Sequence, residues 1–204
     1  MPADLAKGIA EPAPYAAQPE TSIQKNLIES NKVYAANFTQ GHLALPPAKK
    51  YAVGTYHPQY LIRSNTPQVT CMDARIDPSA AFGIALGDAH IIRNAGGSAR
   101  DALRSLVISQ QLLGTNEILL IKHTGCGMLT FQNDDAVKLV GERLGEGAKE
   151  ELQHFGDDFQ SFTHLEAEVE RDVHWLRAVD LIPRQVGVSG WVYEVESGKV
   201  RRVV

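Results

Sequence analysis

The sequence predicts an α/β fold: a central, mainly parallel β-sheet flanked by helices, with an N-terminal helical arm and an antiparallel edge at the C-terminus. From residue 67 onwards, short apolar stretches alternate with amphipathic ones, which indicates strands joined by crossover helices. The stretch EILLIKH (117–123) contains an unbroken apolar run, as expected of a strand buried on both faces. Ser197 and Gly198 separate the last two strand-like stretches and predict a hairpin turn.

The N-terminal part of the chain differs in character from the rest. Residues 1–20 are rich in Ala and Pro and predict a flexible arm. Residues 21–38 carry apolar side chains such as Ile23 and Leu27 at helical spacing, which favours an amphipathic helix. Prolines mark the following stretch as a long loop. The expected organisation is an arm at 1–20, a helix and loop at 21–66, and a single α/β domain at 67–204.

The remaining elements follow in order along this domain. Pro78 suits the first turn of its first helix. Ser98 is placed to act as the N-cap of the next helix, and Gly114 is placed to end it. Residues 145–164 have weak periodicity and are expected to form a surface insertion. The predicted strands are 68–72, 89–94, 117–123, 184–195 and 199–204, and the predicted helices are 78–86, 98–114, 134–145 and 166–179.

Composition and charge exclude several classes of partner. The 204 residues carry a net charge of -4 and scattered basic residues, so we expect no nucleic-acid partner. No apolar run approaches the roughly 20 residues of a membrane span, and the N-terminus lacks the apolar core of a signal peptide. We therefore expect a cytoplasmic protein without a membrane partner, in which Cys71 and Cys126 stay reduced.

Both cysteines lie at the ends of predicted strands. Cys71, Asp73 and Arg75 occupy alternate positions in QVTCMDARID, which would place their side chains on one side of an extended strand. His123 and Cys126 follow the apolar run of the later strand. Ligands of open parallel sheets bind beyond the carboxyl ends of the strands, so the two stretches are expected to meet.

Two thiolates and one imidazole form a ligand set that zinc prefers. Three protein ligands with an open fourth position are typical of catalytic zinc, and Asp73 or water could take that position. Other interpretations stay open at this point. The cysteines could be core residues, Asp73 and Arg75 could form a structural ion pair, and Cys126 could be a nucleophile activated by His123.

Three motifs together resemble the beta-class carbonic anhydrases: CMDAR (71–75), IIRNAGG (91–97) and HTGC (123–126). The resemblance is strong over 68–131, and it is to a clade that includes mycobacterial-type enzymes and carbonyl sulfide hydrolases. It implies one zinc ion per subunit, held by Cys71, His123 and Cys126. It also implies a catalytic Asp73–Arg75 dyad, in which Arg75 keeps Asp73 off the metal, and a closed state in which Asp73 becomes the fourth ligand. A homodimer or homotetramer is implied, with the helix of 21–38 draped over the neighbouring subunit.

The implied reaction is attack of zinc-bound hydroxide on the carbon of a small gaseous substrate, giving bicarbonate from carbon dioxide. The alternative substrate is carbonyl sulfide or carbon disulfide, with release of hydrogen sulfide. A third hypothesis is a zinc-binding protein without turnover. Met72 and Leu129 could supply an apolar substrate pocket, and the turn at Gly96 and Gly97 could offer backbone N–H groups to an anion. The glutamine that many family members place before the first motif has no counterpart here, which favours the sulfur substrates.

Overall fold

The computed structural model describes residues 21–44, 67–156 and 158–204. The chain divides into two units, residues 1–42 and 43–204, and each is described by itself. The expected arm at 1–20 and most of the expected loop, 45–66, lie outside the described residues. None of the described helices has the length and apolar character needed to cross a membrane.

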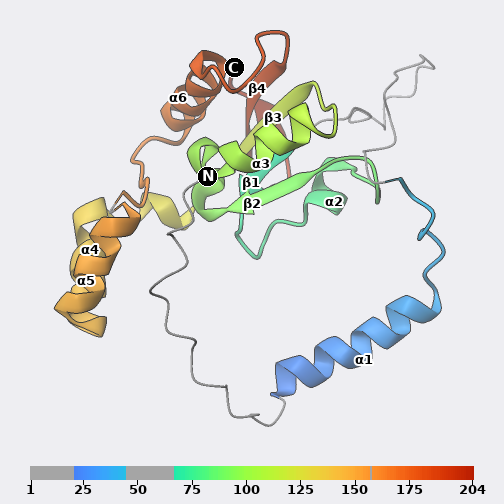
Figure 1. Cartoon of the computed structure of the whole chain (residues 1–204), viewed down its shortest axis with the longest axis horizontal. Helices are drawn as coiled ribbons and strands as arrows, with labels where there is room; N and C mark the ends of the chain where they lie inside the picture. Colours follow the sequence, from blue (N-terminus) through green and yellow to red (C-terminus); the bar gives the residue numbers. More distant parts are fainter. Residues whose placement is uncertain (1–20, 45–66, 157) are drawn as a thin grey trace, which may run out of the picture. The chain divides into compact units, whose positions relative to one another are not determined.

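The second unit is built on one five-stranded sheet with the order β2-β1-β3-β4-β5 (Figure 1). The first four strands along the chain pair in parallel, and β5 pairs antiparallel to β4. The predicted mainly parallel sheet with an antiparallel edge at the C-terminus is therefore confirmed. The strands are β1 (Gln68–Cys71), β2 (Ile91–Asn94), β3 (Glu117–His123), β4 (Gly187–Tyr193) and β5 (Val200–Arg202).

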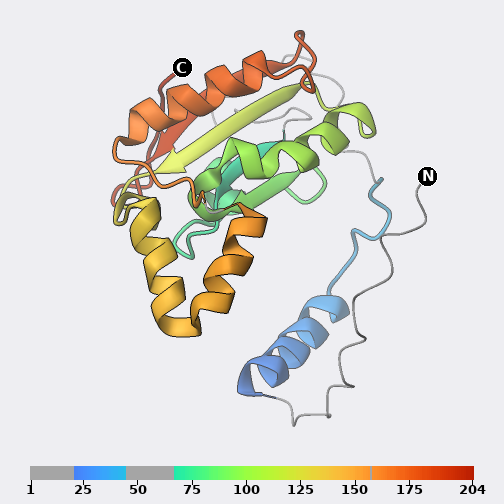
Figure 2. The ribbon, with the colours of Figure 1, turned by 60° about the vertical axis from the view of Figure 1, so that its left-hand side comes forward.

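Helices cover both faces of this sheet. On one face lie α3 and α6 (Figure 2). Ala102 and Leu106 of α3 belong to one apolar cluster with Leu120 of β3 and Leu176 of α6. On the other face, Phe82 of α2 joins a second apolar cluster. The helices of this unit are α2 (Pro78–Phe82), α3 (Ala99–Gln111), α4 (Asn133–Leu144), α5 (Glu146–Phe155) and α6 (Leu165–Ala178), with short 3-10 turns η1 (Ala95–Gly97) and η2 (Gly127–Leu129).

Capping and glycine residues correctly predicted where α3 begins and ends and where the turn between β4 and β5 lies. The Ser98 hydroxyl accepts a hydrogen bond from the backbone N–H of Asp101, so it caps α3 as predicted. Gly114 has a φ of 74° just beyond α3, and Gly198 has a φ of 72° in the turn between β4 and β5. Both angles are conformations that glycine adopts at little cost, which is why these residues stop a helix and make a hairpin.

Two predicted boundaries need correction, and one helix was not predicted. The helix predicted at 78–86 ends at Phe82, because Gly83 takes a left-handed conformation with a φ of 66°. The expected insertion at 145–164 contains the ten-residue helix α5. Lys149 and its acidic neighbours are good helix formers, and the segment is amphipathic at helical spacing. The first strand ends at Cys71, and a turn follows at residues 74 and 75.

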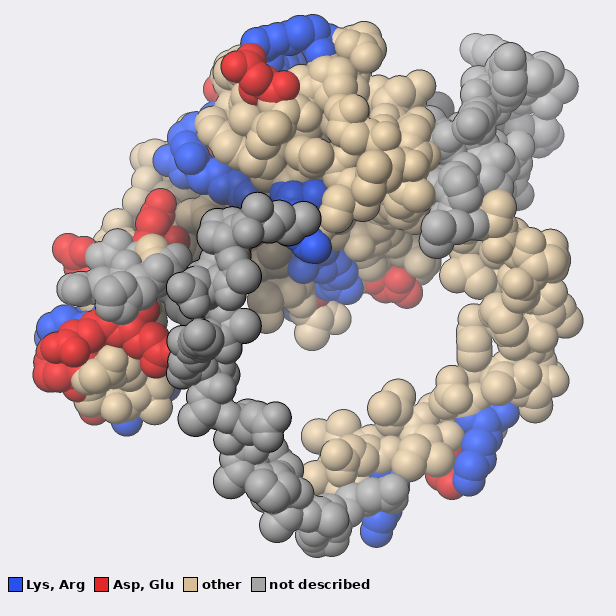
Figure 3. Space-filling model, in the orientation of Figure 1, with Lys and Arg blue, Asp and Glu red and all other residues tan. Residues whose placement is uncertain are grey.

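Acidic side chains gather over the hairpin of α4 and α5 on the face shown in Figure 3. Asp134, Asp135 and Glu146 lie in the first turns of these two helices, where the helix dipole favours negative charge.

The helix of the first unit, α1 (Ser22–Ala36), begins at a capping box formed by Thr21 and Gln24. Every residue of α1 is exposed, including Ile23 at 79%, Leu27 at 67% and Val33 at 69%. An amphipathic helix with all of its apolar side chains in water is typical of an element that packs against another chain.

Candidate metal centre

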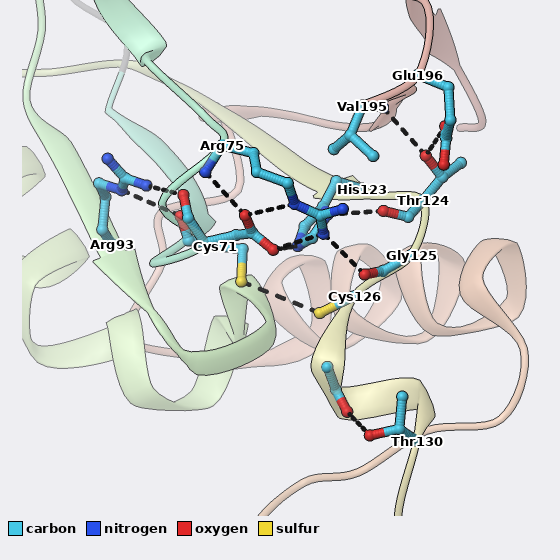
Figure 4. A network of polar contacts seen from close by, with 12 residues as sticks. Cys71, Arg75, Arg93, His123, Thr124, Gly125, Cys126, Thr130, Val195 and Glu196 are labelled. Carbon is cyan, nitrogen blue, oxygen red and sulfur yellow. Dashed lines mark hydrogen bonds and ion pairs between the residues drawn. The ribbon is translucent and has the colours of Figure 1, made fainter.

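The sheet brings the two sequence motifs together at one edge. Cys71 is the last residue of β1, and His123 is the last residue of β3. These strands pair in parallel, so their carboxyl ends lie side by side, and Cys126 follows in the turn after β3 (Figure 4). Cys71, His123 and Cys126 are all buried, with exposed fractions of 4%, 1% and 2%.

The geometry of these three side chains fits a zinc ion. The two sulfur atoms are 4.0 Å apart, and all three ligand atoms lie within 4.8 Å of one another. A tetrahedral ion bound at ~2.3 Å to two sulfurs would separate them by about 3.8 Å. His123 Nε2 is buried and has no hydrogen-bond partner among the described residues. An imidazole nitrogen left unpaired beside two thiols is well suited to bind a soft dication.

The backbone sets the tautomer of His123. Its Nδ1 lies 2.8 Å from the carbonyl oxygen of Thr124, which can only accept a hydrogen bond. Nδ1 therefore carries the proton, and the lone pair of Nε2 points toward the sulfurs. Thr124 is itself held in place, because its hydroxyl donates to Glu196 at 2.6 Å and accepts from the backbone N–H of Val195 at 3.1 Å.

The Cys71 and Cys126 thiols are close enough to share a proton, with their sulfur atoms 4.0 Å apart. A hydrogen bond from Cys126 lowers the pKa of the Cys71 thiol, and His123 and the backbone N–H groups of Asp73 and Gly96 lower it further against the effect of burial. The same hydrogen bond to an ionised Cys71, together with burial, raises the pKa of Cys126. The contact between the two sulfurs favours one thiolate in the pair, and a bound dication would leave both deprotonated.

Arg75 holds the Asp73 carboxylate beside the ligand set. Its Nε and Nη2 donate to the two carboxylate oxygens at 2.9 and 2.7 Å, and its backbone N–H donates to Oδ1 at 2.9 Å. These bonds hold the pKa of Asp73 well below its usual range. Nη2 also donates to the carbonyl of Gly125 at 2.9 Å, which ties the dyad to the loop between His123 and Cys126. Asp73 Oδ2 lies 3.8 Å from His123 Nε2.

Asp73 and Arg75 lie together as predicted, but the predicted cause, alternation of side chains along an extended strand, is wrong. Residues 72–75 leave the strand, so alternation along β1 does not align these side chains. A turn stabilised by the bond between the Asp73 side chain and the Arg75 backbone brings them together instead.

Sequence reasoning missed Arg93 and Glu196. Arg93 of β2 donates from Nε to the carbonyl of Cys71 at 3.0 Å and from Nη2 to the carbonyl of Asp73 at 2.7 Å. It thereby fixes the segment that carries a metal ligand and the dyad carboxylate. The strand register, which pairs Cys71 with Asn94, creates this contact, and no spacing in the sequence signals it.

The other expected site residues lie close to the motifs. Gly96 and Gly97 are buried in η1, Leu129 is partly buried against the core, and Met72 is 65% exposed. Substrate contact by these four residues stays a prediction.

Replacing Gly97 by alanine should weaken metal binding sharply. A Cβ atom there would lie 3.1–3.3 Å from backbone atoms of Thr70 and Cys71, at a φ of 59°. Backbone atoms cannot give way without moving the Cys71 ligand. The matched control is Gly114→Ala, which has a φ of 74° but no atom within 4 Å of its Cβ position. It should cost about 1–2 kcal/mol of stability and leave metal affinity unchanged. Equal metal affinity in Gly97→Ala and wild type would contradict the prediction.

Comparison with known proteins agrees with this site. A family model described as carbonic anhydrase matches residues 67–200. Beta-carbonic anhydrase 1 of Mycobacterium tuberculosis is 33% identical over 183 residues, which span 89% of this chain and 98% of that protein. A carbon disulfide hydrolase of Acidithiobacillus thiooxidans is 36% identical over 145 residues, which span 64% of this chain and 73% of that protein. The solved structure of a carbonic anhydrase from Glaciozyma antarctica superposes with a TM-score of 0.78 at 39% identity, covering 91% of this chain and 100% of that one. The family model covers well over half of the chain, and beta-class relatives exceed 30% identity over most of it, so this chain belongs to the beta class of the carbonic anhydrase family.

Proposed function

We propose that this protein is a zinc-dependent enzyme that hydrates carbon dioxide to bicarbonate. The observation that carries the proposal is the buried Cys71–His123–Cys126 cluster, with the Asp73 carboxylate held next to it by Arg75. A purely structural zinc site needs four protein ligands and no ion pair at its edge. Three ligands beside a restrained carboxylate leave a position for chemistry.

Cys71, His123 and Cys126 would hold the ion. When bound, zinc acts as a Lewis acid that makes hydroxide available from water near neutral pH. The protein supplies orientation. Asp73 is ionised because Arg75 neutralises it, so its carboxylate accepts a hydrogen bond from the attacking oxygen and directs a lone pair at the carbon. As the new C–O bond forms, one C=O electron pair moves onto oxygen, and the products are bicarbonate and a proton released to solvent.

Arg75 has two tasks in this proposal. Its bidentate contact keeps Asp73 from turning toward the ligand set, where Oδ2 is already within 3.8 Å of His123 Nε2. Its positive charge also keeps the carboxylate ionised. Its bond to the Gly125 carbonyl couples the position of the dyad to the loop that carries Cys126.

The second candidate reaction uses the same residues on carbonyl sulfide or carbon disulfide. The similarity to a carbon disulfide hydrolase at 36% identity favours it. The side chains of Met72 and Leu129 support it as well, since they would offer an apolar surface to sulfur. Attack on carbonyl sulfide would give a monothiocarbonate, whose C–S bond then breaks to release hydrogen sulfide and carbon dioxide. Attack on carbon disulfide would give a dithiocarbonate, which releases hydrogen sulfide and leaves carbonyl sulfide for a second round.

We also propose that the active form is a homodimer or a homotetramer, in which α1 packs on a second copy of the chain. The exposed apolar residues of α1 support this, because they are too many to leave in water without a partner. Light scattering should give a multiple of the 22.3 kDa chain mass. A monomer at micromolar concentration would contradict the proposal. A cytoplasmic location stays a prediction.

One paired assay tests the function. Zinc-loaded protein is mixed with carbon dioxide in stopped flow and, in parallel, with carbonyl sulfide and carbon disulfide while hydrogen sulfide is measured. We expect fast hydration with slight sulfide release. Sulfide release that exceeds hydration would establish the second candidate, and inactivity toward all three substrates with zinc bound would contradict an enzymatic role.

A further inference from the structure

Lys122 is a charged residue in the core for which the proposed reaction has no use. It precedes His123 on β3, and its side chain is only 2% exposed. Its ammonium group has three acceptors: Asp172 Oδ2 at 2.9 Å and the carbonyl oxygens of Gly96 and Gly97 at 3.0 and 3.2 Å. These satisfy all three of its N–H donors, and Asp172 on α6 is equally buried, at 6% side-chain exposure.

Both members of the Lys122–Asp172 ion pair form hydrogen bonds with the turn at Gly96 and Gly97 and its first helical residue. Lys122 binds the carbonyls of Gly96 and Gly97, and Asp172 Oδ2 accepts the backbone N–H of Ala99 at 3.2 Å. Peptide groups on either side of Ser98 are therefore tied to a single pair of charges. The turn has little freedom left, although Gly96 and Gly97 both have positive φ angles, of 69° and 59°.

This turn lies against Cys71. The Cβ position of Gly97 is 3.2 Å from the backbone nitrogen of Cys71, so the two backbones are in direct contact. The position of this turn therefore affects the position of the backbone that carries the Cys71 sulfur.

We propose that the Lys122–Asp172 ion pair positions the Cys71 ligand through the turn at Gly96 and Gly97, so that both residues are positioning residues for the metal centre. The inference rests on the proposed zinc site. A buried ion pair is weak evidence of stability, because apolar residues of similar volume often replace one at no cost. Its contacts point to the turn, whose backbone packs closely against that of Cys71.

The test separates positioning from folding. Lys122→Met alone leaves a buried, unpaired Asp172 and should unfold at a lower temperature. The informative variant is Lys122→Met/Asp172→Asn, which removes both charges and keeps an acceptor for the Ala99 N–H. The control is Glu168→Leu/Arg171→Met, which removes a 2.7 Å ion pair of the same helix that makes no hydrogen bond to the turn among the described residues. Circular dichroism checks the fold of each variant.

Zinc affinity is measured by competition with a chelator, and the sulfur-to-metal charge-transfer band is recorded after cobalt substitution. We expect Lys122→Met/Asp172→Asn to bind zinc about 10- to 100-fold more weakly than wild type and to shift the band. The control should match wild type in both. A folded variant with wild-type affinity and an unshifted band would overturn the inference while leaving the zinc site intact. Failure of the wild-type protein to bind zinc would overturn the proposed function, and the inference with it.

Discussion

Replacing His123 by alanine is expected to abolish stable zinc binding and to reduce carbon dioxide hydration to background. His123 supplies the only nitrogen of the three-ligand set, and its Nε2 has no other partner among the described residues. Two thiolates alone cannot complete a site that holds zinc against a chelator. The measurement is metal content by mass spectrometry after dialysis against a chelator, together with stopped-flow hydration.

The matched control is His90→Ala. His90 lies one residue before β2, and its Nδ1 is 2.7 Å from the Ser109 hydroxyl rather than facing sulfur. This variant should retain one zinc per chain and most of its activity. Zinc retained in His123→Ala, or lost in His90→Ala, would show that the metal is bound elsewhere.

Asp73→Asn is expected to lower the hydration rate by a factor of about 10²–10⁴, the usual contribution of one acid–base group, while zinc stays bound. The amide can still accept a bond from Arg75 but has lost the negative charge that attracts the proton of the nucleophile. The expected change lies in kcat at constant zinc content, which distinguishes it from the loss of a ligand.

Asp77→Asn is the control for this substitution. Asp77 lies four residues further along the same segment, and its carboxylate caps α2 by accepting from the backbone N–H groups of Ser79 and Ala80. Asparagine is an equally good cap, so activity and stability should change little. If Asp73→Asn kept full activity, the dyad would be a structural ion pair, as one interpretation of the sequence allowed.

Much of the fold could be predicted because the local signals agree with the tertiary structure. The apolar run at 117–123 is β3 to the residue, and Ser98 and Gly114 mark the ends of α3 by hydrogen bonding and backbone geometry. Helix α5 is an amphipathic helix between Gly145 and Gly156, and it was missed because the stretch of 145–164 was taken as weakly periodic over its whole length. The early end of α2 depends on a glycine that the apolar pattern did not reveal as a stop.

The candidate ligands could be predicted because strand order places the ends of β1 and β3 together, and parallel strands leave their ligands at one edge. The residues that surround and support these ligands could not be predicted. Arg93 lies in the IIRNAGG motif, but its contact with the carbonyl of Cys71 depends on strand register. Lys122 contacts the carbonyl of Gly97, 25 residues away in sequence, and no periodicity signals this contact. Lys122 also lies in the stretch of 117–123, whose apolar run predicts a buried strand and gives no sign of a buried charge.

The most direct test of the central claim is X-ray absorption at the zinc edge of the zinc-loaded protein. Cys71, His123 and Cys126 predict two sulfur atoms at ~2.3 Å and lighter atoms at ~2.0–2.2 Å, at one zinc per chain. His123→Ala should lose this signal, and His90→Ala should keep it. A shell without sulfur, or an unchanged shell in His123→Ala, would contradict the assignment of this cluster as the metal centre.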